Sequence, residues 1–237
     1  GVVYSVTDRN AYDAQSRVNS FLHVNNTRDL ARNGVLLCVN GAGILNSWLR
    51  KNCSANSLFD FDQMNALAST APIGAKGVTI LPFGNGAERI LANREIQGSV
   101  HGLNFNTHSQ SHLFRAAQEG IVFALRYGFD ILAELGVNTK VIKAGKANMF
   151  LSPVFREAFV NTLAAPLELY DTDGAKGAAL GAGVGAGIYA GFDEAFKGLK
   201  LISAQEIEHE KTAAYEAAYQ HWKEILSSTL TESIKHK

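Results

Sequence analysis

The longest periodic segment of the sequence, residues 109–135, predicts a long amphipathic helix. Apolar and small residues recur along it at steps of three and four, and charged residues take the other faces. The recurring positions are Leu113, Ala117, Gly120, Ala124, Tyr127, Ile131 and Leu135. Ser109 or Ser111 can cap the first turn, and Gly136 is placed to end the helix. Helices are therefore part of the fold, and the flanking segments decide whether strands are present as well.

Short apolar runs on both sides of this helix predict strands. VVYSV, SFLHV and VLLCV fall in the first forty residues, with turn signals at Asn25-Asn26 and Asn33-Gly34, and they predict an antiparallel meander. Further strands are predicted in the segments VTIL (78–81), GSVHGLNF, TKVIKAG and PLELYD. Further helices are predicted in NGAGILNSWLRKN, FDQMNALAST, PVFREAFVNTLA after a Ser152-Pro153 start, and SAQEIEHEKTAAYEAAYQHWKEIL, which carries Tyr215, Tyr219 and Trp222 on one side. This order of elements predicts one α/β domain with a mixed sheet flanked by helices.

The stretch TDGAKGAALGAGVGAGIYAG, residues 172–191, combines glycine and alanine to an unusual degree. Its uncharged run covers 16 residues, fewer than the roughly 20 that a membrane-spanning helix needs. GAGVGA at 181–186 fits a dinucleotide-binding fingerprint, but no strand directly precedes it. Thr172 or Asp173 can cap a helix in which small residues recur every four positions. Small residues spaced in this way form two neighbouring rows along the helix. They predict tight helix-on-sheet packing, either alone or with a flat ligand ring near the helix start.

The charge balance argues against a nucleic-acid partner. Lys plus Arg and Asp plus Glu both number 22 in the 237 residues, which predicts a mixed, solvated surface. Cys38 and Cys53 show neither metal-ligand spacing nor a disulfide framework, as is typical of a cytoplasmic protein. His101, His108 and His112 suggest a metal site, because the four-residue spacing in HSQSH can bind zinc. No third ligand stands nearby, so no protein-bound metal is expected. The chain opens in a strand-like run, GVVYSVTDRN, which predicts that an upstream part is missing.

Four motifs, in this order along the chain, resemble the FGGY family of carbohydrate kinases. LPFGNGAERI (81–90) is similar to the family's L-P-x-x-x-G-E-R segment, with Ala87 as an extra residue. FRAAQEGIVFALRYGFDIL (114–132) is similar to its R-A-x-x-E-G-x-x-x-A-L helix. IKAGKANMFLSPVFREAF stands where the family carries an adenosine loop, I-x-G-G-G-A-x-S, and DTDGAKGAALGAG resembles the next element, E-x-x-A-x-G-A-A. Within the family, the resemblance is closest to the xylulokinase branch.

The resemblance implies an actin-like ATPase (ribonuclease H-like) fold and a two-domain kinase with a cleft between the domains. Residues 1–237 would form the C-terminal, nucleotide-binding domain, and the N-terminal sugar-binding domain would be absent from this chain. The implied activity is transfer of the ATP γ-phosphate to a sugar hydroxyl, with D-xylulose as the expected substrate and Mg²⁺ carried by ATP. The general-base Asp is expected upstream of Gly1, so no catalytic residue is expected in this chain and the fragment alone should be inactive. The implied partners are ATP, a sugar and the N-terminal domain. A homodimer is a further expectation.

Phosphate contacts are expected where glycine-rich turns precede helices. By resemblance, Gly1 ends a phosphate-binding turn, Gly43 in NGAGILNSW contacts phosphate, and Ser47 lies one turn further on. A glycine C-cap or plain turn is the alternative for Gly43. Glu88 and Arg89 are expected to form an ion pair, either shaping the interdomain cleft or merely lying on the surface.

The expected adenosine loop departs from the family pattern. The triple glycine is reduced to Ala144-Gly145-Lys146, and three extra residues precede Ser152, which leaves the register of the loop open. Gly145 is expected to let the backbone lie against the base or ribose, and Asn148 to bond the adenine. Lys146 either contacts a phosphate or is a solvated side chain, and the solvated interpretation is preferred. Asp173 or Gly174 is expected near the ribose. This altered loop also supports the rival interpretation, a non-catalytic actin-like ATP-binding or assembly module.

Overall fold

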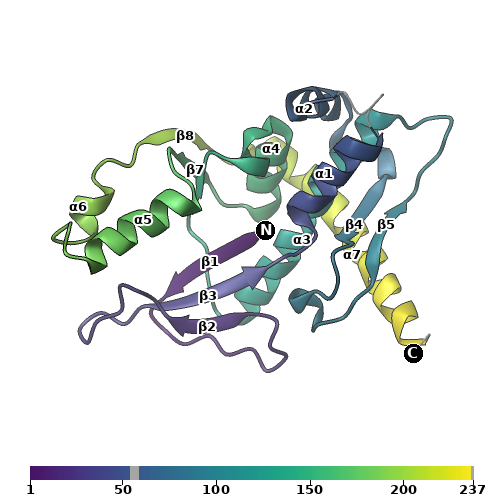
Figure 1. Cartoon of the computed structure of the whole chain (residues 1–237). Helices are drawn as coiled ribbons and strands as arrows, with labels where there is room; N and C mark the ends of the chain where they lie inside the picture. Colours follow the sequence, from purple (N-terminus) through teal and green to yellow (C-terminus); the bar gives the residue numbers. More distant parts are fainter. Residues whose placement is uncertain (54–58, 236–237) are drawn as a thin grey trace.

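The computed structural model describes residues 1–53 and 59–235 (Figure 1). Its strands are β1 (Val2–Thr7), β2 (Asn19–Leu22), β3 (Asn33–Cys38), β4 (Thr79–Phe83), β5 (Gln97–His101), β6 (Ile142–Gly145), β7 (Leu167–Tyr170) and β8 (Leu201–Gln205). Its α-helices are α1 (Ala42–Cys53), α2 (Phe61–Thr70), α3 (Gln110–Glu134), α4 (Pro153–Leu163), α5 (Gly174–Gly185), α6 (Phe192–Phe196) and α7 (His209–Lys235). Short 3-10 helices cover Ile73–Gly77, Arg89–Leu91 and Asn148–Leu151. In this part of the chain the strands form three sheets, ordered β1-β3-β2, β4-β5 and β6-β7-β8.

The first three strands pair antiparallel, but the predicted meander is wrong. β3 lies in the centre and pairs with both β1 and β2, which do not pair with each other. Burial explains this order, because four of the six β3 residues are buried whereas all four β2 residues are exposed. The most apolar strand takes the position with neighbours on both sides, and the exposed strand takes the edge.

Helix α3 is the long helix that the sequence predicts over residues 109–135. Ser109 and His112 form a reciprocal cap at its start, and Gly136 follows its end with a left-handed φ of +77°. Gly120 allows α3 to approach β4 closely, because a Cβ there would lie 2.3 Å from the carbonyl oxygen of Ile80. Helices α1, α2, α4 and α7 all contact α3, so it organises most of the molecule.

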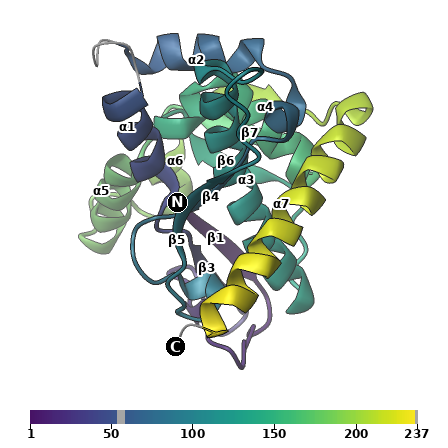
Figure 2. The ribbon, with the colours of Figure 1, turned by 90° about the vertical axis from the view of Figure 1, so that its right-hand side faces the viewer.

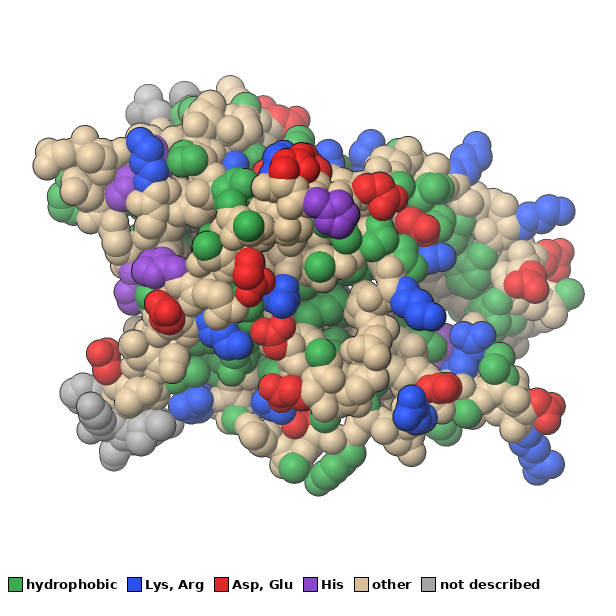
Figure 3. Space-filling model, turned by 180° about the vertical axis from the view of Figure 1, so that it is seen from behind, with side chains coloured by type: hydrophobic (Ala, Val, Ile, Leu, Met, Phe, Trp, Pro, Cys, Tyr) green, Lys and Arg blue, Asp and Glu red, His purple; other side chains and the backbone are tan. Residues whose placement is uncertain are grey.

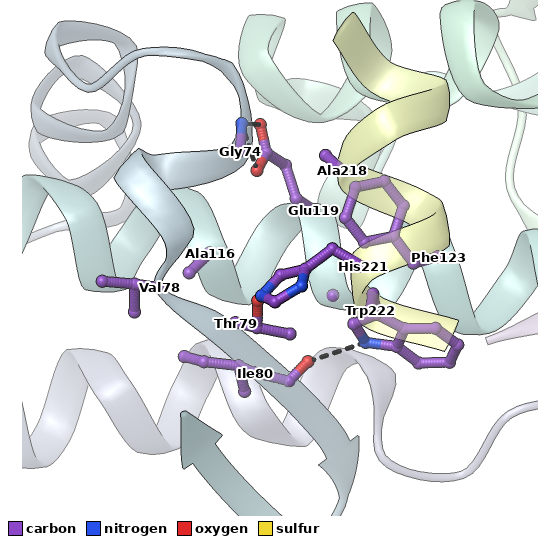
Figure 4. A pocket seen from close by; sticks show the side chains of 11 residues that line it. Gly74, Val78, Thr79, Ile80, Ala116, Glu119, Phe123, Ala218, His221 and Trp222 are labelled. Atoms are coloured by element: carbon purple, nitrogen blue, oxygen red, sulfur yellow. Dashed lines mark hydrogen bonds between the residues drawn. The ribbon is translucent and has the colours of Figure 1, made fainter. Parts of the chain in front are cut away.

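Helix α7 closes the core with the aromatic side that the sequence predicts. It runs along one side of the molecule (Figure 2) and contacts α4, α3 and β4. Tyr215, Tyr219 and Trp222 have no exposed surface. The indole Nε1 of Trp222 donates to the carbonyl oxygen of Ile80 at 3.0 Å (Figure 4). Both ends of the chain contribute to one core, which includes residues from Ala11 to Leu230.

The third sheet is mixed, because β6 and β7 are parallel whereas β7 and β8 are antiparallel. The sequence patterns do not reveal β8, an edge strand with four of its five residues exposed. Helix α5 begins as predicted, with the Asp173 carboxylate accepting from the backbone nitrogen of Lys176 at 2.8 Å. Figure 1 shows α5 and α6 projecting from one end of the molecule.

The predicted tight packing of the glycine-alanine helix is wrong. A Cβ added at Gly177, Gly181 or Gly185 would meet no atom within 4 Å. Gly183 belongs to the other row of small residues on this helix. A Cβ there would meet only the ring of Tyr189, a residue of the following turn. Periodicity shows which helix positions lack side chains, but it cannot show whether another element lies against them.

The surface carries interspersed charges of both signs, as the composition predicts. Figure 3 shows Lys and Arg side chains alternating with Asp and Glu over the back of the molecule. In the described part of the chain, no helix combines the length and apolar character needed to cross a membrane.

Candidate functional site

A large cleft lies between β1, the starts of α1 and α5, helix α2, and the segment that joins β6 to α4. Its volume is about 2050 Å³, larger than the roughly 300–1000 Å³ of typical small-molecule sites. Six of the seven residues predicted to contact a nucleotide line it, namely Gly1, Gly43, Ser47, Gly145, Asn148 and Gly174. Lys146, Glu88 and Arg89 are not among its lining residues. Segments far apart in the sequence thus meet at one cleft with room for more than one small molecule.

The turn from β3 into α1 forms one wall of the cleft. Gly41 is the residue that this turn requires, because a Cβ there would lie 1.5 Å from the carbonyl oxygen of Pro82. Gly43 lies inside the first turn of α1, so it is not a helix C-cap, and a Cβ there would meet nothing within 4 Å. Ser47 is exposed one helical turn later. The first amides of a helix have no intrahelical acceptor and carry partial positive charge, which suits an anion.

Glu88 holds this turn from behind. Its side chain is fully buried, and its carboxylate accepts from the backbone nitrogens of Asn40 (3.0 Å) and Gly41 (3.1 Å). Burial raises the pKa of Glu88, and the two backbone donors oppose that shift. The Arg89 guanidinium donates instead to the side chain of Asn19. The expected Glu88–Arg89 ion pair is therefore wrong, because the two side chains have different partners, the backbone of the β3–α1 turn for Glu88 and Asn19 for Arg89.

The segment after β6 forms the opposite wall. Gly145 brings the end of β6 against the start of α5, because a Cβ there would lie 2.1 Å from the carbonyl oxygen of Thr172. The Lys146 side chain is exposed, as the solvated interpretation expects. Asn148 is exposed and adopts a left-handed φ of +53°. The Arg156 guanidinium fixes the rest of the loop by donating to the carbonyl oxygens of Phe150 (2.7 Å) and Leu151 (3.1 Å).

The start of α5 completes the cleft. Gly174 is exposed, and a Cβ there would meet nothing within 4 Å. The Asp173 side chain also lines the cleft, but its carboxylate is engaged by the backbone nitrogen of Lys176. The cleft is thus lined by the first turns of two helices, α1 and α5, each with a glycine where a side chain would occupy the open space.

Asn46 and Asn65 line the cleft as well, although the sequence patterns do not point to them. Asn46 lies on the buried face of α1 together with Ala42 and Leu49, at steps of four and three. A polar residue within an apolar helix stripe is the signal that would have identified it.

Among the residues that the structure describes, no histidine or cysteine lines the cleft. The rings of His108 and His112 lie 5.2 Å apart, and His101 bonds Ser99 at 2.8 Å. Within residues 1–53 and 59–235, no group of three His, Cys, Asp or Glu side chains is placed to hold a metal. Cys38 and Cys53 are free, half-buried thiols.

Comparison with known proteins identifies the family. The sequence model of the C-terminal domain of the FGGY family of carbohydrate kinases matches residues 31–190. The chain belongs to this family. It is 29% identical over 182 residues to the xylulose kinase of Bacillus subtilis, a match that covers 76% of this chain and 35% of the relative. It is 42% identical over 84 residues to the xylulose kinase of Haemophilus influenzae, covering 35% of this chain and 17% of the relative.

Solved structures establish the fold. The ligand-bound xylulose kinase of Lactobacillus acidophilus superposes with a TM-score of 0.80 at 21% identity, covering 100% of this chain and 47% of that protein. The glycerol kinase of Plasmodium falciparum with ADP gives a TM-score of 0.76 at 19% identity, covering 97% of this chain and 45% of that protein. The expected actin-like ATPase fold is thereby confirmed. The chain spans less than half the length of these relatives.

Proposed function

We propose that this chain is the ATP-binding half of a carbohydrate kinase that transfers the γ-phosphate of ATP to a sugar hydroxyl. The observation that carries the proposal is the meeting of Gly1, Gly43, Ser47, Gly145, Asn148 and Gly174 at one cleft. D-xylulose is the proposed substrate, because two of the matching relatives are xylulose kinases. The gluconokinase of Bacillus licheniformis, 29% identical over 104 residues, keeps gluconate as a second candidate.

The cleft suits a nucleotide chemically. The open first turns of α1 and α5 offer backbone donors to phosphate, at Gly43 and Gly174 respectively. Ser47 would add a hydroxyl on the phosphate side, and Gly145 and Asn148 would contact the adenosine. When bound, ATP would supply the phosphoryl group, and Mg²⁺ would arrive with the phosphates, as is usual for this ion. This chain's residues would hold the nucleotide and orient its phosphates, which is most of what phosphoryl transfer requires.

The remaining parts of the enzyme are proposed to lie outside these 237 residues. Residues 1–237 would be the C-terminal domain of a two-domain kinase, and the N-terminal domain would bind the sugar. The general-base Asp would precede Gly1, so this chain alone would not transfer phosphate. A cytoplasmic location fits metabolic kinases of this kind, and a homodimer is a further possible assembly.

A non-catalytic ATP-binding or assembly module is the second candidate. The altered loop Ala144-Gly145-Lys146 favours it, because the family pattern has three glycines at this place. Such a module would bind ATP in the same cleft and would need no general base.

The test is ADP release by the full-length polypeptide in a coupled assay. D-xylulose would be compared with D-gluconate, ribulose, rhamnulose and glycerol. We expect turnover that is selective for D-xylulose, and no turnover by residues 1–237 alone. ATP binding without turnover on any sugar would contradict the kinase proposal and favour the assembly module. Turnover by residues 1–237 alone would contradict the placement of the base.

A further inference from the structure

Three polar side chains form a hydrogen-bonded row whose two ends, Ser152 and Asn65, both line the cleft. Gln118 on α3 is fully buried, and Ser152 at the start of α4 is 2% exposed. The Ser152 hydroxyl donates to Gln118 Oε1 at 2.6 Å, and Gln118 Nε2 donates to Asn65 Oδ1 at 3.0 Å. Asn65 on α2 is half-buried and lines the cleft. Three helices thus contribute one side chain each to a continuous hydrogen-bonded chain that ends at the cleft.

The hydrogen-bond pattern fixes the direction in which these three side chains donate to one another. Ser152 Oγ accepts from the backbone nitrogen of Phe155 at 3.3 Å, as the cap of α4, and its own proton goes to Gln118. A buried hydroxyl needs an acceptor for its proton, so Gln118 presents its oxygen to Ser152 and its nitrogen to Asn65. The Asn65 oxygen is therefore used internally. Asn65 can therefore present to the cleft its amide nitrogen, which is a donor only, beside the second lone pair of its oxygen.

We propose that Asn65 donates a hydrogen bond to the ligand in the cleft, and that Gln118 and Ser152 are positioning residues that set the direction of its amide. The inference rests on the proposed function, since the ligand is taken to be the nucleotide. The recognised group is a hydrogen-bond acceptor of that nucleotide, either on the adenosine moiety or on a phosphate. Ser152 also ends the loop that carries Asn148, so the same three side chains tie that loop to α2.

The decisive measurement is calorimetric binding of ADP and of adenosine to the full-length polypeptide. Asn65→Asp keeps the shape of the side chain but removes both amide donors, and Asn65→Ala removes the whole group. We expect each variant to weaken ADP binding about tenfold, the range of one lost hydrogen bond. Asn52→Asp makes the same chemical change on the exposed face of α1, outside the cleft lining, and should leave binding unchanged.

The two ligands locate the acceptor. In Asn65→Ala, which introduces no charge, equal losses for ADP and adenosine would place it on the adenosine moiety, and a loss for ADP alone would place it on a phosphate. Wild-type affinity in both Asn65 variants would overturn the inference while leaving the proposed function intact. Failure of the wild-type protein to bind either ligand would overturn the proposed function and, with it, this inference.

A double-mutant cycle tests the positioning role. Gln118→Met removes both hydrogen bonds of Gln118 while keeping a similar volume. We expect it to weaken ADP binding severalfold when Asn65 is present and to have no further effect in the Asn65→Ala background. Equal effects in both backgrounds would show that Gln118 acts on the fold rather than through Asn65. That result would overturn the positioning role of Gln118.

Discussion

At the scale of single residues, the glycines of the cleft differ in what surrounds them. Gly43 and Gly174 face open space, whereas Gly41 and Gly145 lie against the backbone of another segment. The first pair leaves room for a ligand. The second pair lets the turn into α1 pack against β4, and the end of β6 against the start of α5. Substitutions at the two kinds of position should therefore affect different properties, binding in one case and folding in the other.

Gly43→Leu should weaken nucleotide binding without destabilising the fold. The new side chain would extend into the open cleft beside the first turn of α1. Leu also favours a helix over Gly by up to about 1 kcal/mol, so the melting temperature should not fall. Titration with ADP and thermal unfolding measure the two effects. Ile44→Val, at the next position but outside the cleft lining, is the control. Unchanged ADP affinity in Gly43→Leu would argue against a phosphate at this turn.

Gly145→Ala should destabilise the protein by about 1–3 kcal/mol, the cost of forcing a methyl group into a filled space. Its Cβ would lie 2.1 Å from the carbonyl oxygen of Thr172, so β6 and the start of α5 would have to separate. Urea unfolding measures the change. Gly177→Ala is the matched control, because its Cβ would meet nothing within 4 Å, and alanine should stabilise this helix by about 1 kcal/mol. A loss of stability in Gly177→Ala would mean that another surface packs on α5.

At the scale of elements, a buried ionic network joins α3 to its neighbours. Glu119 pairs with Arg115 at 2.7 Å and accepts from the backbone nitrogen of Gly74 at 3.1 Å, in the 3-10 helix before β4 (Figure 4). Arg115 also bonds the Tyr215 hydroxyl of α7 at 2.8 Å and approaches Glu157 of α4 at 3.4 Å. Removing one member takes a hydrogen-bond or charge partner from each of its neighbours, so these helices depend on one another.

This network should make stability depend on pH through Glu119. Burial raises its pKa from 4.5 to about 7, with Arg115 opposing the shift. The folded state therefore binds this proton more tightly than the unfolded state, and the resulting stability is full below pH 4.5 and lost as the pH rises to about 7. The difference in unfolding free energy between wild type and Glu119→Gln should fall across this range, by at most about 1.4 kcal/mol per pH unit. A difference that is constant or rises with pH would contradict this assignment.

The elements differ in how well the sequence predicts them. Helix α3 and the aromatic side of α7 follow from periodicity, because burial imposes the same period on the sequence. The order of β1, β2 and β3 and the surroundings of α5 do not follow, because they depend on contacts between distant segments. In the cleft, the glycine turns are visible in the sequence, whereas Asn65 is not, because its role comes from Gln118 and Ser152 on other helices.

At the scale of the whole molecule, α7 is an integral part of the fold although it lies beyond the matched family segment, which ends at residue 190. Trp222 contacts the rings of Phe83, Phe123, Tyr127 and Tyr219. Trp222→Ala should therefore cost about 3–5 kcal/mol of unfolding free energy. Glu224→Ala, on the exposed side of the same helix, should change it by less than about 0.5 kcal/mol. Equal, small effects in urea unfolding would mean that α7 is not needed for the core.

The cleft of this chain is proposed to bind the nucleotide. The most direct test is photolabelling of the full-length polypeptide with 8-azido-ATP, followed by mass spectrometry of tryptic peptides. We predict label in peptide 147–156, which carries Asn148, and loss of that label when excess ATP is present. Peptide 95–115, which carries β5 and lies outside the cleft lining, should remain unlabelled. ATP-protected label confined to peptides outside the cleft would contradict nucleotide binding in this cleft.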